Sequence, residues 1–301
     1  MNNVYVLGSI NMDMVISTPY MPAQGETLTG SNFFLNGGGK GANQAVAVAK
    51  QNVPTYLIAS LGNDVFGNEL YNNLNSYKVD TTNVKKLDGV SSGVAMIIIH
   101  NNDNRIILDS GSNYKITAAQ IDEALKNAKE NDVFITQLEN NLDAVIYGLQ
   151  KAKANNMITI FNPAPAVKLQ QDIFNYVDYL IVNEGECELL SNINPDSDEN
   201  ILKAYHKLNA KSLIITLGSK GSLYINNDKI VKIAPNKVNA IDTTAAGDTY
   251  VGIFASQLVK GVSVVDALNY ASVGSSLTCL KKGAQQSIPY HDEIIEYLKN
   301  K

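Results

Sequence analysis

The chain has 301 residues, a hydrophobic fraction of 45%, a charged fraction of 18% and a formal net charge of −5. This length suffices to bury a large core, as one big α/β domain or two small ones. The acidic balance excludes the basic surface with which proteins bind nucleic acid or an anionic membrane. The longest strongly apolar run, residues 94–99, is far too short to cross a bilayer, and the N-terminal segment has no basic or cleavable apolar region. The distant Cys187 and Cys279 suit a reducing compartment, so the sequence predicts a cytoplasmic protein.

Strand-like and helix-like segments alternate along almost the whole chain. This rhythm is typical of βαβ units and predicts a Rossmann-like, three-layer α/β/α fold with a mostly parallel central sheet. The expected strands are residues 4–9, 55–61, 132–138, 157–161, 179–182 and 212–216. The expected helices are residues 42–51, 68–77, 118–129 with Thr117 as N-cap, 144–155, 186–191, 200–208, 248–260 and 264–280. No linker or repeat interrupts the pattern, which predicts a single domain over 1–301.

Two stretches break the alternation. Residues 14–35 hold Thr-, Val- and Phe-rich pieces split by Pro19, Pro22 and Gly25, with no helical period. Residues 93–109 read as two strands around a turn at 101–104. We expect antiparallel strands that form one small accessory sheet, built from insertions at about 13–36 and 93–109.

A glycine-rich loop, NGGGKGAN at 36–43, opens onto a helix pattern. A phosphate loop of the Walker type needs Ser or Thr after its lysine, but Lys40 is followed by Gly41 and Ala42. A dinucleotide fingerprint should follow the first strand, yet GSINMD stands there. The loop is therefore predicted to let backbone approach a ligand, with the Asn43 amide on its hydroxyls; a tight turn is the ordinary alternative.

The segment DTTAAGD at 242–248 runs into a second helix pattern. The amides of Ala245, Ala246 and Gly247 at the start of that helix would form a pocket for a phosphoryl group. Asp248 beside them would accept a proton from an attacking hydroxyl. A helix cap at Asp248 is the alternative that composition alone favours.

Polar side chains follow other strands at their carboxyl ends, where parallel sheets bind ligands. Asn11, Asp13 and Glu139 would bind the hydroxyls of a polyol, or would stabilise turns as surface residues. Asn183 and Glu186 in NEGE would order the water shell of Mg²⁺ on a nucleotide, or would begin a helix. TLGSKG at 216–221 suits close approach by a nucleotide, although a hairpin turn explains it as well.

Together and in this order, the motifs resemble those of the ribokinase-like (PfkB) carbohydrate kinase family over essentially the whole chain. GGKGAN near the N-terminus with DTTAAGDT near the C-terminus is a specific pair. The motifs are GSINMD (8–13), GGGKGANQAVA (37–47), QLE (137–139), NPAPA (162–166), NEGECELL (183–190), ITLGSKG (215–221), DTTAAGDTY (242–250) and KKGAQQSIP (281–289).

The resemblance implies ATP-dependent phosphorylation of the 5-hydroxyl of D-ribose, with Asp248 as the base and the Ala246 and Gly247 amides as the anion hole. It implies sugar contacts at Asn11, Asp13, Gly38, Gly39, Lys40, Asn43 and Glu139. It implies nucleotide contacts at Asn183, Glu186, Thr216, Gly218, Ser219, Gly221, Gly247 and Ser272, with Mg²⁺ held indirectly through Asn183 and Glu186. It implies an activating K⁺ at Asp242, Thr244, Thr278, Lys281, Gly283 and Ser287. The accessory sheet corresponds to the family's lid, which often forms a homodimer interface.

Two positions depart from the family pattern. Ser272 stands where a larger polar residue is expected near the adenine, and Thr278 replaces a smaller residue. Alternatives to a ribose kinase are a 2-deoxyribose kinase, another sugar or nucleoside kinase of the family, a sugar sensor that lost catalysis and, remotely, a nicotinamide dehydrogenase. Asn11 favours ribose, because its amide would engage a 2,3-diol that a deoxy sugar lacks. No nucleic acid or membrane is expected as a partner.

Overall fold

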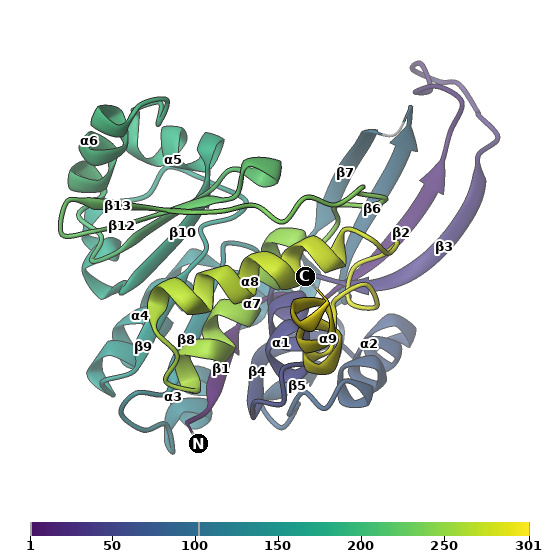
Figure 1. Cartoon of the computed structure of the whole chain (residues 1–301). Helices are drawn as coiled ribbons and strands as arrows, with labels where there is room; N and C mark the ends of the chain where they lie inside the picture. The colour runs from purple at the N-terminus through teal and green to yellow at the C-terminus, as the bar shows by residue number, and fades with distance from the viewer. Residues whose placement is uncertain (1, 102, 301) are drawn as a thin grey trace.

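The computed structural model describes residues 2–101 and 103–300 and contains a large mixed sheet between two layers of helices (Figure 1). The strands of this sheet are β1 (Val4–Leu7), β4 (Thr55–Gly62), β5 (Val84–Leu87), β8 (Val133–Thr136), β9 (Ile158–Phe161), β10 (Tyr179–Asn183), β11 (Leu213–Thr216), β12 (Ser222–Asn226) and β13 (Lys229–Ile233). Within the described residues their order is β13-β12-β11-β10-β9-β8-β1-β4-β5. Neighbours from β5 to β11 pair in parallel, and β12 and β13 add an antiparallel edge.

Helices cover both faces of the sheet. They are α1 (Lys40–Ala49), α2 (Val65–Ser76), α3 (Ala118–Leu125), α4 (Leu142–Ala154), α5 (Glu184–Ser191), α6 (Asp198–Leu208), α7 (Ala246–Val259), α8 (Val264–Thr278) and α9 (His291–Lys299), with short 3-10 turns at Gly111–Lys115, Gln171–Tyr176 and Gly218–Lys220. In the described part of the chain, no helix combines the length and apolar character needed to cross a membrane. The predicted three-layer α/β/α fold is confirmed.

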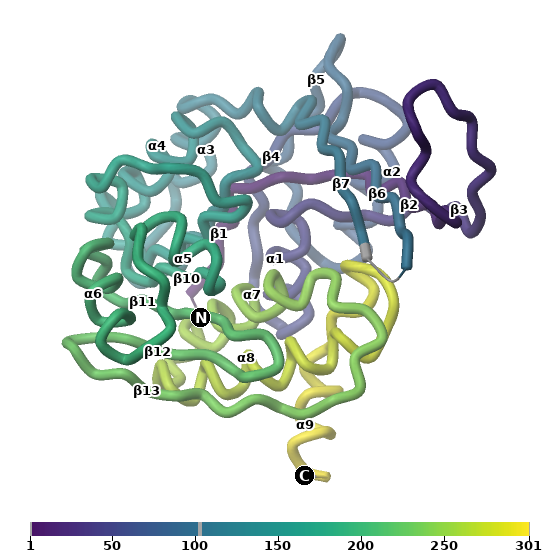
Figure 2. The backbone as a smooth tube through the Cα atoms, turned by 90° about the horizontal axis from the view of Figure 1, so that it is seen from above, coloured from purple at the N-terminus to yellow at the C-terminus, as the bar shows by residue number. Residues whose placement is uncertain are grey.

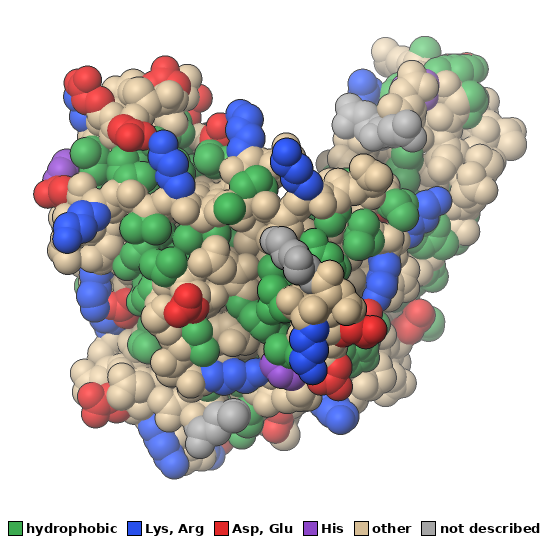
Figure 3. All heavy atoms as spheres, in the orientation of Figure 1, with side chains coloured by type: hydrophobic (Ala, Val, Ile, Leu, Met, Phe, Trp, Pro, Cys, Tyr) green, Lys and Arg blue, Asp and Glu red, His purple; other side chains and the backbone are tan. Residues whose placement is uncertain are grey.

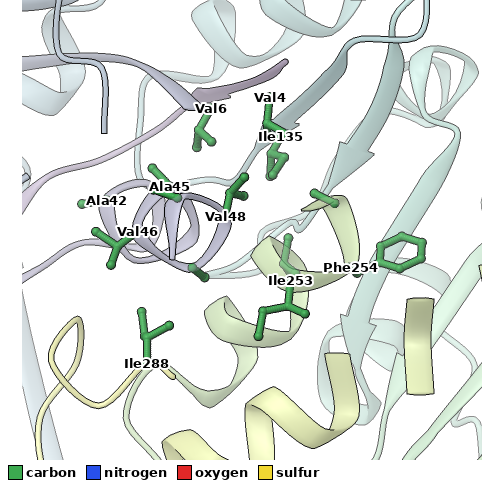
Figure 4. Close-up of a cluster of buried hydrophobic side chains, with 14 of the residues drawn as sticks. Val4, Val6, Ala42, Ala45, Val46, Val48, Ile135, Ile253, Phe254 and Ile288 are labelled. Carbon is green, nitrogen blue, oxygen red and sulfur yellow. The ribbon is translucent and has the colours of Figure 1, made fainter. Parts of the chain in front are cut away.

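The large sheet has a hydrophobic core on each of its two faces, and β1 contributes to both. Successive residues of a strand point to opposite faces. Val4 and Val6 join the cluster formed with α1 and α7 (Figure 4). Tyr5 and Leu7 join the second cluster, formed with α3, α4, α5 and α6. All four side chains are buried, so the strand reads as a continuous apolar run rather than an alternating one.

A second sheet stands apart from this body as an arm, which we call the lid (Figures 1 and 2). Its strands, in spatial order within the described residues, are β3 (Ser31–Gly38), β2 (Asn11–Ser17), β6 (Gly93–His100) and β7 (Asp103–Asp109). A notch separates the lid from the lobe that carries α6 and β13 (Figure 3). The lid strands form a sheet of their own, as expected from the two insertions.

The expectation of purely antiparallel strands is wrong at the centre of the lid. The outer pairs are antiparallel, but β2 and β6 run parallel, with Asn11 opposite Gly93. The physical reason is that β2 follows β1 and β6 follows β5, and both parent strands end at the same edge of the parallel sheet.

Strand β5, helix α9 and the hairpin β12–β13 escaped the sequence patterns because polar side chains interrupt their apolar positions. Strand β5 exposes two of its four residues, Lys85 and Lys86. Helix α9 is amphipathic but buries only Ile294 fully. The hairpin β12–β13 lies at the edge of the sheet, where polar side chains interrupt the apolar run.

Candidate active site

A cavity of about 240 Å³ lies where the starts of α1 and α7 meet the carboxyl ends of β9, β10 and β11. This is the position at which open parallel sheets bind ligands. The cavity is lined by Lys40, Asn162, Ala164, Ile181, Val182, Asn183, Glu186, Thr216, Thr243, Ala245, Gly247, Asp248 and Val251. Segments from five predicted motifs therefore converge on one space.

Three of the four glycines in the 36–43 loop each have a separate steric reason. A Cβ at Gly41 would overlap the backbone of Gly8, so α1 starts directly against the end of β1. Gly39 has φ +89°, a conformation that favours glycine. A Cβ at Gly38 would overlap the carboxylate of Asp13. These glycines thus let the loop pack closely against Asp13 and the end of β1, while its approach to a ligand stays a prediction.

The start of α7 presents an open amide to the cavity. Ala245 is the N-cap residue, with φ 60°, and gives no side-chain cap. The Ala246 N–H already donates to the Thr243 carbonyl at 3.2 Å. The Gly247 N–H finds no acceptor within residues 2–101 and 103–300, as is normal for the first turn of a helix. Gly247 and Ala245, which line the cavity, are therefore better placed as anion donors than Ala246.

Asp248 lies in the first turn of α7 and is 7% exposed, so the alternative that it caps the helix is wrong. Its Oδ2 accepts from Asn43 Nδ2 and its Oδ1 from Gln44 Nε2, both at 3.0 Å. These donors come from α1, which contacts α7. The carboxylate is thus held at both oxygens while it faces the cavity.

Glu139, which follows β8, contacts predicted sugar-binding residues at the starts of β2 and α1. Its Oε2 accepts from Ser9 Oγ at 2.5 Å, from the Lys40 N–H at 3.1 Å and from Asn11 Nδ2 at 3.3 Å. Asn11 and Glu139 also line a smaller cavity of about 40 Å³. The other residues that line it are Leu108, Asp109, Ser110, Asn113, Tyr114, Leu138 and Pro165. Among the described residues, Oε1 of Glu139 receives no hydrogen bond.

Asn11 is held at both ends of its amide. Besides its contact with Glu139, its Oδ1 accepts from Asn113 Nδ2 at 2.7 Å. Asn113 is 1% exposed and also bonds the backbone N–H and carbonyl of Ile10. Asn113 belongs to no predicted motif, and no feature of its sequence surroundings points to this contact.

Asp13 is 8% exposed, and no side chain or amide of the described residues donates to it. Burial, followed by the charges of Glu139 and Asp248, raises the pKa of Asp13 to about 7. Nearby, Asn43 Oδ1 is buried without a partner in the described part of the chain. Asp13, Glu139 and Asn43 thus leave acceptor oxygens open, which is the complement of a ligand with several O–H donors.

The half-buried side chain of Lys40 is the positive charge of the larger cavity. The charge of Asp248 raises the pKa of Lys40, against the opposing effect of burial and together with Glu139 and Glu186. Its ammonium group therefore stays protonated among three carboxylates and can attract an anionic ligand.

Asn183 and Glu186 begin a helix, which confirms one of their two predicted readings. Asn183 Oδ1 accepts from the Glu186 N–H, and Glu186 Oε2 accepts from the Asn183 N–H, both at 2.8 Å, which is a capping box at the start of α5. Both residues also line the larger cavity. Burial raises the pKa of Glu186 above its ordinary value, with the charge of Asp248 adding a smaller effect.

The predicted nucleotide residues are only partly brought together. Thr216 ends β11 and lines the cavity, and the turn Gly218–Lys220 continues from it. A Cβ at Gly221 would overlap the Ile233 carbonyl, so that glycine also serves the β12–β13 hairpin. Ser272 lies on α8 away from the cavity lining; its Oγ accepts from Asn236 Nδ2 at 3.1 Å and donates to the Ala234 carbonyl at 3.3 Å.

Asp242 links two of the segments predicted to bind a monovalent cation. Its Oδ1 accepts from the Thr244 N–H and Oγ1, and its Oδ2 from the Gly283 N–H at 2.9 Å. Burial raises the pKa of Asp242, but these hydrogen bonds outweigh it and leave the pKa below its ordinary value. One carboxylate beside loop carbonyls is an all-oxygen donor set, which fits an alkali cation.

The other predicted cation residues make contacts of their own. Thr278 Oγ1 donates to Thr249 Oγ1, Lys281 Nζ pairs with Glu293 at 2.6 Å, and Ser287 Oγ donates to the Ala284 carbonyl. These side chains are thus engaged, and only their backbone carbonyls are candidates for a cation. For Mg²⁺, no group of three or more His, Cys, Asp or Glu side chains able to hold a metal occurs in residues 2–101 and 103–300. Asn183 and Glu186 suit indirect contact through water.

Several polar residues of the site were not predicted. Gln44 and Asn162 lie inside quoted motifs, so the motifs were the available signal, and Gln137 begins the QLE motif. Ser9 follows the first strand and reaches Glu139. No sequence motif marked Asn113 as a site residue, because its contacts depend on where the chain returns from the lid to the main sheet.

Comparisons with known proteins agree with this geometry. A model described as pfkB family carbohydrate kinase matches residues 1–290. The chain is 39% identical to ribokinase of Schizosaccharomyces pombe, covering 96% of this chain and 95% of that protein. It is 35% identical to deoxyribokinase of Salmonella typhi, covering 98% of each. The structure of Arabidopsis thaliana ribokinase complexed with ribose and ATP matches with a TM-score of 0.92, at 28% identity over 99% of both chains. The chain therefore belongs to the pfkB family of carbohydrate kinases.

Proposed function

We propose that this protein is an ATP-dependent kinase that phosphorylates D-ribose at O5, giving D-ribose 5-phosphate and ADP. The observation that carries the proposal is the group of open acceptor oxygens on Asp13, Glu139 and Asn43, next to a held Asp248 and an open helix amide. A polyol supplies the hydroxyl donors that these oxygens lack. The similarity to ribokinases over nearly the full chain supports the choice of ribose.

In the proposed reaction, Asp248 accepts the proton of the 5-hydroxyl as O5 attacks the γ-phosphorus of ATP. The new O5–P bond forms, the bond from the γ-phosphorus to the bridging oxygen breaks, and ADP leaves with the electron pair. The Gly247 and Ala245 amides and the Lys40 ammonium stabilise the charge on the transferred group. Asp248 needs little basicity, because the proton can leave late in a loose transition state.

The proposal assigns Mg²⁺ and K⁺ to separate positions. Asn183 and Glu186 would hold Mg²⁺ through water, and the ion would neutralise charge on the phosphates. Asp242, with the carbonyls of residues 244, 278, 281, 283 and 287, would hold K⁺ and order the loop before α7. Thr216, Gly218, Ser219 and Gly221 would contact ATP, and Ser272 is the weakest of the proposed nucleotide contacts.

We place the lid over the sugar and at a homodimer interface, and the protein in the cytoplasm, where its two free cysteines would stay reduced. The exposed apolar side chains of the lid support the interface. The single domain 1–301 with a lid from the two insertions remains part of the proposal.

A specific observation favours 2-deoxyribose as the second candidate substrate. Asn11 is bonded at Oδ1 by Asn113 and at Nδ2 to Glu139, which leaves one N–H for a ligand. Its contribution to recognising a 2,3-diol is therefore smaller than a free amide would give. The match to a deoxyribokinase at 35% identity agrees with this alternative.

A coupled ADP-release assay tests the proposal, with ribose, 2-deoxyribose, fructose, adenosine and pseudouridine as acceptors, each with and without K⁺. We expect the highest kcat/KM with ribose and a gain in rate with K⁺. A higher kcat/KM for 2-deoxyribose would make that sugar the assigned substrate and leave the proposed phosphoryl transfer unchanged. Absence of ADP release with every acceptor would overturn the proposal and favour a sensor.

A further inference from the structure

Gln44 lies beneath the proposed base and belongs to no role assigned above. Its side chain is fully buried on α1. Its Nε2 donates to Asp248 Oδ1 at 3.0 Å and to Asn162 Oδ1 at 3.2 Å. Its Oε1 accepts from Gln137 Nε2 at 2.6 Å. The carboxamide thus has partners at both ends, and one of them is the carboxylate that faces the cavity.

The contacts with Gln137 and with Asp248 agree on the orientation of the Gln44 amide, while Gln137 Oε1 is itself buried without a partner among the described residues. Because Gln137 Nε2 points at Gln44 Oε1, the nitrogen of Gln44 is left for the carboxylate. The reverse orientation would place Gln44 Oε1 against Asp248 and remove an N–H donor from a negative charge. Gln137 is itself fully buried, so water does not compete for this contact.

The backbone supports the same arrangement. A Cβ at Gly252 of α7 would overlap the Gln44 carbonyl and crowd the Ala47 side chain. The two helices therefore meet closely about one turn beyond Asp248. This backbone contact fixes the position of Gln44 along the axis of α7, independently of the side-chain hydrogen bonds.

We propose that Gln44, oriented by Gln137, is a positioning residue that holds the Asp248 carboxylate in the rotamer that accepts the proton of the acceptor hydroxyl. The inference rests on the proposed function, since it assigns Asp248 the role of base. Asn43 holds Oδ2 of Asp248, and the fully buried Gln44 holds Oδ1. Gln44 contacts neither substrate, so its loss acts on turnover rather than on binding.

Gln44→Met keeps the length of the side chain and removes the donor. We expect kcat to fall about 10- to 100-fold, while the KM for the sugar and for ATP changes less than threefold. Gln120→Met is the matched control, because Gln120 is also buried and donates to the carbonyls of Ala59 and Asn83, away from the cavity. A folded Gln44→Met protein with kcat within threefold of the parent would overturn the proposal.

Gln44→Glu tests the contact with Asp248 through its charge. Glutamate has the shape of glutamine, but its carboxylate would be fully buried and would face that of Asp248. A Gln44→Glu protein as active as the parent would therefore contradict the contact with Asp248. We expect kcat to fall in the order parent, Gln137→Met, Gln44→Met, Gln44→Glu. Gln137→Met also provides the test if the Gln44 variants fail to fold, and an unchanged kcat there contradicts the role of Gln137.

A double-mutant cycle of Gln44→Met with Asp248→Ala tests the contact without any turnover. We expect the two changes to be non-additive by at least fivefold in the unfolding equilibrium constant measured by urea. Additive effects would overturn the proposal even in an active enzyme. A coupled pair in a protein that phosphorylates no acceptor would instead overturn the proposed function and leave the contact standing.

Discussion

The carboxylate of Asp248 receives amide hydrogen bonds at both oxygens and still lines the cavity. A residue held in this way is suited to take one proton from one direction. Its position in the first turn of α7 puts it beside the Gly247 amide, which is the proposed phosphoryl site. The base and the anion donor therefore come from the same few residues of one helix.

Replacing Asp248 by Asn should preserve sugar binding and lower kcat by about three orders of magnitude, since the amide cannot accept the proton. Isothermal titration with ribose and the ADP-release assay measure the two effects. Asp266→Asn serves as a control, because Asp266 lies in the first turn of α8 but outside the cavity. Near-normal turnover in the Asp248 variant would remove Asp248 from its assigned role.

The burial of Asp13 lowers the stability of the fold at neutral pH. A carboxyl whose pKa is raised from 3.8 to about 7 lends the folded chain stability below pH about 4, and this stability is lost as pH rises toward 7. Asp13→Asn removes the free-energy cost of keeping an ionised carboxyl buried at this position. We expect it to raise the free energy of unfolding at pH 8 by up to roughly 4 kcal/mol, with a smaller gain at pH 5. Urea unfolding at both pH values measures the difference.

The same Asp13 variant should raise the KM for the sugar at least tenfold, because a charged acceptor is replaced by an amide. Asp228→Asn, at an exposed side chain, provides the comparison and should alter neither property. A variant that gained no stability at pH 8 would show that the Asp13 carboxylate is solvated in the free protein.

At the scale of elements, the alternation of apolar strands with helices predicted the layered fold because both faces of the sheet are covered. The starts of α1 and α7 were also predictable, since runs of Gly and Ala precede them. The amide contacts among Gln44, Gln137 and Asp248 were not, because they depend on how α1 packs against α7. A buried glutamine has the same sequence signature whether it meets a carbonyl or a carboxylate.

The parallel pairing of β2 with β6 was likewise hidden from the sequence. Each strand alone reads as an accessory strand, and direction follows only once β1 and β5 are known to be parallel members of one sheet. Asn113 belongs to the same class, because it bonds Ile10 and Asn11 only after the chain has returned from the lid.

Asn113→Ala should raise the KM for ribose about tenfold, because Asn11 and the backbone at Ile10 lose their shared partner. Steady-state kinetics with ribose and 2-deoxyribose measure the effect. Asn141→Ala is the control: Asn141 caps α4 and bonds the carbonyls of Tyr114 and Ile116 without contacting Asn11. An equal rise in KM in both variants would indicate a general loss of stability rather than loss of the Asn11 contact.

At the scale of the whole molecule, the lid exposes large apolar side chains that a monomer would leave in water. The exposed residues are Phe33, Phe34, Leu35, Met96, Ile106, Ile107 and Leu108. Several exposed apolar side chains on one small sheet are typical of an interaction site. It agrees with the proposed homodimer through the lid.

Ile107→Asp should therefore convert the dimer to a monomer, because it places a charge on a residue that is 64% exposed in the single chain. Sedimentation velocity measures the change. Val65→Asp, at a side chain that is 79% exposed on α2, should leave the mass unchanged. A parent protein that sediments as a monomer at micromolar concentration would contradict the dimer.

The open acceptors of Asp13, Glu139 and Asn43 have a consequence for how long the protein lasts in a cell. A sugar that satisfies them binds only the folded chain, and so it lowers the population of unfolded molecules that proteases attack. We expect ribose alone, without ATP, to slow thermolysin digestion of the parent protein and to have a smaller effect on Asp13→Asn at the same ribose concentration. The supply of substrate would then set the amount of the enzyme as well as its rate.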